Sequence, residues 1–328
     1  MSVTQPDNSL SVRSAAKRGW RQGQQWLRAL AARNYVTAKA LFQLRLWLAE
    51  RRQGDPVLVY QMGKVGSTSV VRSLRAAGVK QPLYHIHDLN PATLASNEQL
   101  YRRKYDGEWQ RPSHLWTSQY LLRRLAQPAQ RERPWKIITL TRDPVRRNLS
   151  AFFQTLELEF DRRLGQAASQ PDGQLVAELS ELFLTQVHWH DYPLTWFEAE
   201  LKRVFEVDVY AAGFPQAQGY RRYQGPRAEV LVIKLELLDK CGPAALREFL
   251  KLEGFTSLSA NRSVDKQYYP LYRQLVNSIR LPSSYLDRMY TSQYARHFYS
   301  EEELGRFRAR WGSRSRLEAA PTGASRHD

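Results

Sequence analysis

Cysteine, acidic residues and long apolar runs are all scarce in this sequence. Its 328 residues include a single cysteine, Cys241, which excludes an intramolecular disulfide framework and a zinc finger built on thiolates. No stretch approaches the ~18 uncharged apolar residues that a membrane-spanning helix needs. The first ten residues lack the basic-then-apolar pattern of a secretory signal peptide. We therefore expect a soluble, cytoplasmic protein.

The shortage of acidic residues leaves a strong positive charge. The chain has 49 Lys plus Arg against 32 Asp plus Glu, a formal net charge of +17. Residues 10–52 hold ten basic residues and one acidic residue, and so carry +9 of that charge. Such an excess indicates an anionic partner: nucleic acid, anionic lipid, or a phosphorylated or sulfated small molecule. The concentration of charge outside the expected fold leaves a nucleic-acid-binding protein open as an alternative, but not an economical one, and we expect no specific nucleic-acid partner.

Hydrophobic residues make up 42% of the chain and aromatic residues 12%, which excludes a mainly disordered protein. Short apolar runs at 57–60, 83–87, 136–141 and 229–235 predict strands, and helical patterns lie between them. This alternation predicts an α/β fold with a mostly parallel central sheet. We expect a basic amphipathic helix region at 1–53, an α/β domain at 54–311 and a disordered tail at 312–328.

The basic region at 13–52 interleaves Trp and Leu with Arg and Lys, and two interpretations stay open. In the first, a helix packs on the domain that follows it. In the second, the helix lies on an anionic membrane surface, which would make the protein peripheral at the inner face of the membrane.

The segment VLVYQMGKVGSTSVVRSL reads as a strand, a glycine-containing loop and a helix. Two glycines allow a tight turn whose amides point at an anion over a helix N-terminus. A lysine adds charge, and three hydroxyl residues add donors. The candidate anion-binding residues are Lys64, Gly66, Ser67, Thr68 and Ser69. Their order differs from the GK[ST] ending of an ATPase or kinase P-loop, which disfavours a P-loop kinase.

A second segment, KIITLTRDPVRRNLSAFF, delivers Arg142 at the end of a strand. Asp143 and Pro144 then predict a helix start, with Asp143 as the N-cap, and Asn90 with Pro91 shows the same pattern earlier in the chain. Near the C-terminus, Ser300 and Glu303 predict a capping box at the start of the last helix. Ser150 follows Arg142 by eight residues, so the two side chains can converge on one phosphate.

Together, the two segments resemble the cofactor signature of sulfotransferases that use 3′-phosphoadenosine 5′-phosphosulfate (PAPS). The resemblance implies a P-loop-like three-layer fold, a 5′-phosphosulfate loop at Lys64–Ser69, and a 3′-phosphate clamp of Arg142 and Ser150. The chain also looks like a bacterial family of sulfotransferase-like proteins associated with capsular polysaccharide synthesis, over roughly residues 55–311. That likeness implies a glycan acceptor. The GxKG-type cofactor loop of cytosolic sulfotransferases is absent, and Arg262 and Lys266 are candidates for its role.

Sulfuryl transfer to a hydroxyl needs a general base and no metal. Strand alternation puts His85 and His87 on one face, and the carboxyl end of the strand favours His87. Related sulfotransferases often keep a catalytic histidine between the two cofactor motifs. His114 and the carboxylates Glu157 and Glu159 remain alternatives.

Two other functions stay open. The pairs His85/His87 and His188/His190 could suggest a metal site, but no third ligand is convincingly placed. The chain could also be a relative of sulfotransferases that binds a nucleotide or glycan without turnover.

Overall fold

The computed structural model of the chain describes residues 34–104, 112–128, 133–167, 173–185, 189–253, 255 and 269–312. A five-stranded sheet with the order β2-β1-β3-β5-β4 lies at its centre. The strands are β1 (Val57–Tyr60), β2 (Leu83–Ile86), β3 (Trp135–Thr141), β4 (Tyr220–Gln224) and β5 (Ala228–Lys234). Only β4 runs antiparallel to its neighbour. The predicted α/β class with a mostly parallel sheet is confirmed.

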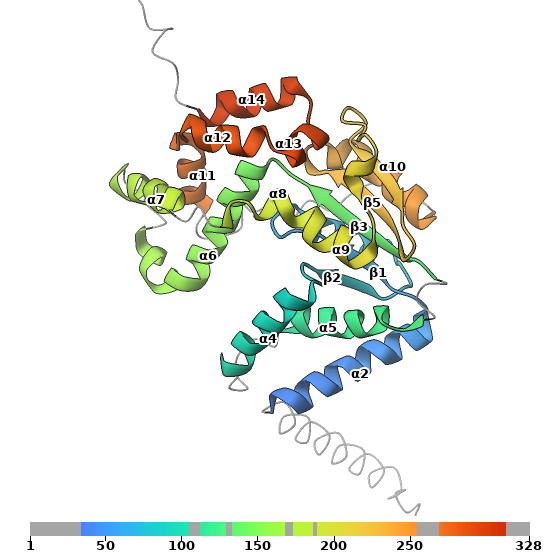
Figure 1. Cartoon of the computed structure of the whole chain (residues 1–328). Coiled ribbons are helices and arrows are strands. Elements are labelled where there is room, and N and C mark those ends of the chain that lie inside the picture. The colour runs from blue at the N-terminus through green and yellow to red at the C-terminus, as the bar shows by residue number, and fades with distance from the viewer. Residues whose placement is uncertain are drawn as a thin grey trace, which may run out of the picture.

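Helices cover the sheet in a three-layer arrangement (Figure 1). The helices of the first half are α2 (Tyr35–Gln53), α3 (Ser67–Ala76), α4 (Pro91–Lys104), α5 (Ser113–Leu125), α6 (Pro144–Ala167) and α7 (Gly173–Thr185). A continuous helical stretch then comprises α8 (Tyr192–Trp196), the π-helix η3 (Phe197–Lys202) and α9 (Arg203–Phe205). Short 3₁₀ turns η4 (Val209–Ala211) and η5 (Leu235–Leu237) flank β4 and β5. The last helices are α10 (Leu238–Leu250), α11 (Tyr269–Ser278), α12 (Ser283–Tyr290), α13 (Gln293–Phe298) and α14 (Glu301–Trp311).

The predicted helix starts are confirmed where the capping chemistry is local. The Asn90 side chain accepts a hydrogen bond from the Ala92 amide at 3.0 Å, and Asp143 accepts one from the Val145 amide at 3.0 Å. Ser300 caps α14 in a reciprocal capping box with Glu303. These caps satisfy amides that the first helical turn leaves without partners.

One strand of the sheet was not predicted from the sequence. Strand β4, Tyr220–Gln224, pairs antiparallel with β5 but is too rich in arginine to show an apolar run. The helical pattern at 174–204 has a break near Pro193, and the structure agrees: α7 ends at Thr185, and Pro193 lies in the first turn of α8, where its missing N–H costs no hydrogen bond.

The two faces of the sheet carry different side chains. Val59 of β1 pairs in register with His85 of β2, so alternation sends both side chains to the face covered by α3. Tyr60 points to the other face, where its ring packs against Trp196 and Phe205. The histidine pair and the aromatic layer therefore lie on opposite sides of the sheet.

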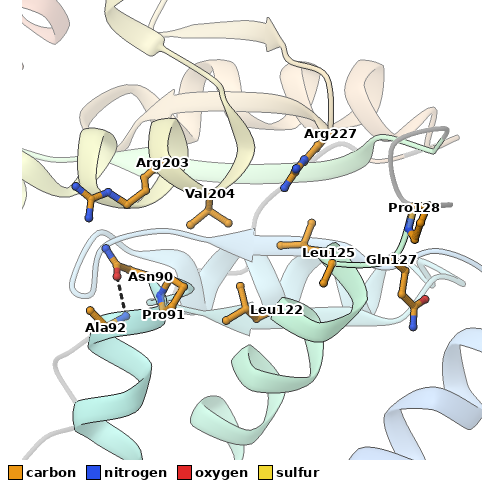
Figure 2. Close-up of a pocket in the computed structure, with 11 residues that line it drawn as sticks. Asn90, Pro91, Ala92, Leu122, Leu125, Gln127, Pro128, Arg203, Val204 and Arg227 are labelled. Atoms are coloured by element: carbon orange, nitrogen blue, oxygen red, sulfur yellow. Dashed lines mark hydrogen bonds between the residues drawn. The ribbon is translucent and has the colours of Figure 1, made fainter.

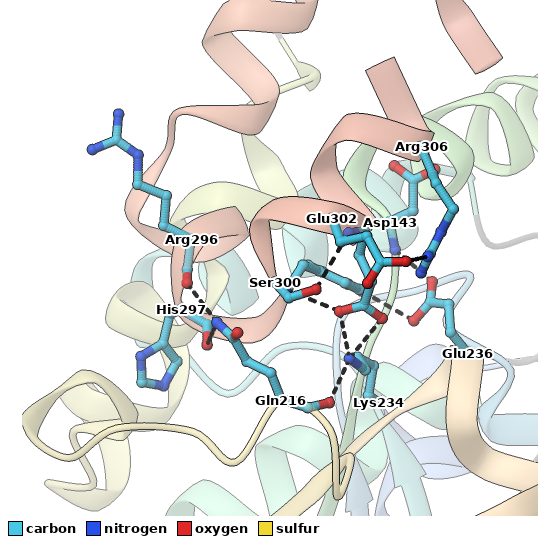
Figure 3. Close-up of polar contacts among 11 residues, drawn as sticks. Asp143, Gln216, Lys234, Glu236, Arg296, His297, Ser300, Glu302 and Arg306 are labelled. Atoms are coloured by element: carbon cyan, nitrogen blue, oxygen red, sulfur yellow. Dashed lines mark hydrogen bonds and ion pairs between the residues drawn. The ribbon is translucent and has the colours of Figure 1, made fainter. Parts of the chain in front are cut away.

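The C-terminal helices hold the carboxyl ends of β3 and β5. Lys234, fully buried at the end of β5, donates to the Gln216 carbonyl and forms an ion pair with Glu303 at 2.9 Å (Figure 3). The carboxylate of Asp143, just after β3, accepts from Tyr290 and from the Trp311 indole. Buried polar groups on the sheet are thus paired with α12 and α14.

Among the described elements, helix α2 is the outermost on its side, with α5 between it and the sheet (Figure 1). Tyr35 and Phe42 pack on Trp116 of α5. Glu50 is buried against the same helix and pairs with Arg124 at 2.9 Å. Across the described part of the chain, no helix combines the length and apolar character needed to cross a membrane.

Candidate functional site

The strand order places the loops after β1 and β3 at a topological switch point. From β1 the chain passes to β2 on one side, and it later returns to β3 on the other side of β1. The connections leaving β1 and β3 therefore diverge, and a crevice at the carboxyl ends of such strands is the usual ligand site of open α/β sheets. The two segments singled out in the sequence both begin here.

The loop after β1 passes through two residues with left-handed backbone conformation, Lys64 and Gly66. Gly66, the N-cap of α3, has a φ of 83°, and a Cβ at this position would lie 2.6 Å from Leu235 Cδ1. The left-handed backbone at Gly66 therefore disfavours any other residue, and a side chain here would also require Leu235 to shift. Lys64 also has a positive φ, 74°, which is uncommon for a residue other than glycine.

Two arginines from the β3–α6 segment hold this loop. The Arg142 guanidinium donates to the Lys64 carbonyl at 2.6 Å, and Arg147 donates to the Gly63 carbonyl at 3.1 Å. The Arg142 backbone is itself fixed, because the Tyr294 hydroxyl accepts from its N–H and donates to its carbonyl. The structure thus brings the Arg142 side chain and the Lys64 backbone together.

Arg147 is a site residue that the sequence analysis missed. Its side chain is only 7% exposed; its Nε donates to Gly63, and its guanidinium also bonds Asn148 and lies over the Tyr192 ring at 4.7 Å. Within the described residues it forms no ion pair with a carboxylate, and burial lowers its pKa. A buried cation without an acidic partner is costly, and this cost favours an anionic ligand beside it. Only its place five residues after Arg142 could have pointed to it.

The positions of the remaining cofactor-binding candidates give less information about the site. Ser150 is half-buried on α6, and no hydrogen bond joins it to Arg142 in the described structure. Thr68 is exposed in the first turn of α3. Arg262 and Lys266 lie outside the described residues.

Ser67 is engaged with the histidine pair. Gln61 Nε2 donates to Ser67 Oγ at 2.7 Å, and Ser67 Oγ lies 2.8 Å from His85 Nε2. Ser67 Oγ accepts from Gln61, and it can direct its own proton at His85 Nε2 when that nitrogen is unprotonated. Ser67 is therefore a link between the loop and His85 in this structure. Burial, with His87 and Arg75 nearby, lowers the pKa of His85 to about 4.

The contacts of His87 indicate which of its ring nitrogens carries a proton. His87 Nδ1 lies 2.9 Å from the Gln61 backbone carbonyl, an oxygen that can only accept. This contact is shorter than the 3.4 Å between Nδ1 and Gln61 Nε2, so it favours the tautomer with a proton on Nδ1, and in that neutral ring Nε2 keeps the lone pair. The two imidazole rings are 5.0 Å apart. Of the pair, His87 has the geometry of a general base.

A buried carboxylate holds the segment that carries His87. Glu200 Oε2 on η3 accepts from the amides of Leu89 and Asn90 at 2.8 and 2.9 Å, and also bonds the Tyr60 hydroxyl. Burial raises the pKa of Glu200. π-helical turns such as η3 occur frequently at functional sites. No local sequence pattern marks Glu200, because all its partners are distant in the chain.

The alternative bases are less informative. His114 lies 3.5 Å from the Tyr101 hydroxyl, and burial lowers its pKa. The side chains of Glu157 and Glu159, and all of His188, lie outside the described residues. Elsewhere in the described chain, no three His, Cys, Asp or Glu side chains gather in a way that would hold a metal ion.

A pocket of about 750 Å³ lies away from this site, between α5 and α9 (Figure 2). Leu122, Leu125 and Val204 form much of its apolar lining, with Arg203 and Arg227 on one side. It opens on the face of the sheet opposite His85 and His87, and none of the predicted site residues that the structure describes lines it.

The comparison with protein families gives one match. Residues 174–300 are similar to the NKWYS family, described as "Putative capsular polysaccharide synthesis protein". The matched segment runs from α7 to the start of α14 and contains β4 and β5. It excludes both the Lys64 loop and the Arg142 segment. No curated protein and no solved structure matches the chain.

Proposed function

We propose that the chain is a PAPS-dependent sulfotransferase that moves a sulfuryl group to an acceptor hydroxyl on a glycan. The observation that carries the proposal is the buried Arg147, which has no acidic partner in the described structure and lies against the loop that Arg142 also holds. This loop precedes the N-terminus of α3 at the switch point of the sheet. A site of this charge and geometry suits a ligand with phosphate or sulfate groups.

Each predicted residue then has a role. Lys64, Gly66, Ser67, Thr68 and Ser69 would hold the 5′-phosphosulfate, and Arg142 and Ser150 the 3′-phosphate. Arg262 and Lys266 would complete the nucleotide site. By analogy with phosphoryl transfer, the protein mainly positions the reactants and neutralises charge. Lys64 and the loop amides would stabilise the charge that grows on the leaving phosphate as its bond to sulfur breaks.

His87 is the base in this proposal. Its Nε2 lone pair would take the proton of the acceptor hydroxyl while that oxygen forms its bond to sulfur. The Gln61 carbonyl would stabilise the imidazolium that results, since it already accepts from Nδ1. His85, with its lowered pKa, would stay neutral and hold Ser67.

The glycan acceptor is supported by the family match over residues 174–300. Because this segment excludes both predicted cofactor motifs, it bears on the glycan-related role and not on the sulfuryl donor. The donor rests on the Lys64 and Arg142 segments alone.

Calorimetry with 3′-phosphoadenosine 5′-phosphate and, separately, with ATP tests the donor class. We expect binding of the first and not of the second; the reverse preference would favour a P-loop kinase. Transfer of labelled sulfate from PAPS to a capsular polysaccharide is the matching activity assay. A chain that binds the nucleotide but transfers nothing to a panel of glycans would fit the non-catalytic alternative.

His87→Asn separates catalysis from binding. The Asn amide can replace Nδ1–H in the hydrogen bond to Gln61, but it offers no base. Turnover should fall by about 10²–10⁴-fold, with affinity for the product nucleotide unchanged. A variant that retains full turnover would exclude His87 as the base.

A further inference from the structure

The outward face of α2 gathers the large exposed apolar side chains of the described chain. These residues are Val36, Leu41, Leu44, Trp47 and Leu48. Leu44 is 49% exposed and Trp47 is 41% exposed. At about 100° per residue, all five fall within less than half of the helix circumference. The opposite face carries Tyr35, Ala38 and Phe42 against Trp116. Helix α2 is therefore apolar on two sides, and α5 covers only one.

The exposed charged side chains that α2 itself carries around this outward face are positive. Arg45, Arg51 and Arg52 are exposed on α2, and the Arg51 guanidinium lies 4.6 Å from the centre of the Trp47 ring. The acidic residue of the helix, Glu50, is turned inward and pairs with Arg124. An apolar strip edged by arginines, with tryptophan among them, matches the boundary between headgroups and acyl chains of an anionic bilayer.

We propose that the outward face of α2 docks the protein on an anionic lipid surface. The interface would be monotopic: the helix lies along the membrane, with its inner face still packed on α5. This inference is independent of the sulfuryl-transfer proposal, since it rests on α2 and not on the site at β1 and β3.

Charge disfavours the two other occupants of this face. A second copy would bring the Arg45, Arg51 and Arg52 sets of two chains together, each chain carrying a net charge of +17. Residues 1–33 hold six basic residues and one acidic residue, so they have the same sign as the arginines around the face. Like charges brought together oppose association, whereas anionic headgroups favour it.

The test is flotation of the full chain with vesicles of phosphatidylcholine, with and without phosphatidylglycerol. We expect binding to the anionic vesicles that weakens as salt is raised, because the electrostatic share is screened. Leu44→Ser with Trp47→Ser should lower vesicle affinity by about tenfold or more, since both side chains lose apolar burial. Arg45→Gln with Arg52→Gln should lower it by about twenty-five-fold, at roughly fivefold per basic residue.

A matched control carries the same charge change elsewhere. Arg247→Gln with Arg273→Gln removes two exposed arginines from α10 and α11, and should leave vesicle affinity nearly unchanged. Unaltered melting temperatures confirm that each variant is folded. The proposal fails if the full chain does not float, if the α2 variants float as well as the wild type, or if the control loses as much affinity. A lipid-free dimer that Leu44→Ser with Trp47→Ser dissociates would make this face a self-association surface instead.

Discussion

Lys64 combines a charged side chain with a left-handed backbone, and the two contributions can be separated by substitution. Lys64→Met keeps the strained φ of 74° but removes the charge. Turnover should fall by about 10²–10³-fold, while binding of 3′-phosphoadenosine 5′-phosphate changes little, because the charge matters most as the leaving phosphate develops. Lys64→Gly should lose turnover equally, yet be no less stable than Lys64→Met, since glycine adopts this φ without steric cost. Full turnover in either variant would give the lysine a purely structural role.

Substitution of Arg147 tests whether its buried positive charge contributes to ligand binding or to the stability of the fold. Arg147→Met should weaken binding of 3′-phosphoadenosine 5′-phosphate by about 1.5–3 kcal/mol, the range for hydrogen bonds to charged groups. The free energy of unfolding should change little, because the penalty for burying an unpaired guanidinium disappears together with its two hydrogen bonds. The exposed neighbour offers the control, and Arg146→Met should change neither quantity. Full nucleotide affinity in Arg147→Met would contradict the assignment.

The lowered pKa of His85 predicts a pH-dependent stability. The imidazole titrates near 6.5 in the unfolded chain and near 4 in the folded one, so the folded state binds fewer protons between these values. The free energy of unfolding contributed by His85 should therefore fall as the pH is lowered from about 6.5 towards 4. His85→Gln removes this ionisation and still offers an acceptor to Ser67. Chemical denaturation at several pH values should show a wild-type-minus-variant difference that is constant above pH 7 and declines below it. A difference that is flat with pH would contradict the neutral, buried His85.

Between elements, the ion pair of Lys234 and Glu303 joins β5 to α14 (Figure 3). Glu303→Gln leaves the Lys234 charge buried without its counter-charge and should lower the free energy of unfolding by about 3 kcal/mol. The adjacent Glu302 is exposed and pairs with the exposed Arg306, so Glu302→Gln should cost no more than about 0.5 kcal/mol. Thermal or denaturant unfolding measures both.

A double variant shows how much of the lost stability comes from leaving the Lys234 charge buried without its partner. Adding Lys234→Met to Glu303→Gln removes the unpaired charge and should recover part of the lost stability. Equal losses in Glu302→Gln and Glu303→Gln would show that the buried pair contributes nothing particular.

Across the whole molecule, the sequence predicted the features that depend on neighbouring residues, but not those that depend on contacts between residues far apart in the chain. Apolar runs located β1, β2, β3 and β5 because strands buried in a parallel sheet need apolar side chains on both faces. Asn90 and Asp143 were identified as caps because their partners lie two residues away. Strand β4 was missed because it is an edge strand rich in arginine, stabilised mainly by its pairing with β5.

The candidate site shows the same division. The Lys64 loop and Arg142 follow from strand, glycine and proline patterns. Arg147 and Glu200 were missed, because what distinguishes them is burial beside Gly63 and beside Leu89, and such burial depends on the tertiary fold. The second apolar side of α2 was equally hidden, since the sequence cannot say which side α5 covers.

The hydrogen bonds from the C-terminal helices to the segment after β3 affect when the candidate site can form during synthesis. Arg142 is held by Tyr294, and Asp143 by Tyr290 and Trp311. During synthesis the Lys64 loop and β3 leave the ribosome long before these partners do. We expect the nascent chain to acquire nucleotide affinity only after Trp311 has emerged. On a ribosome stalled earlier, the chain would have formed part of its sheet but not the proposed anion-binding site.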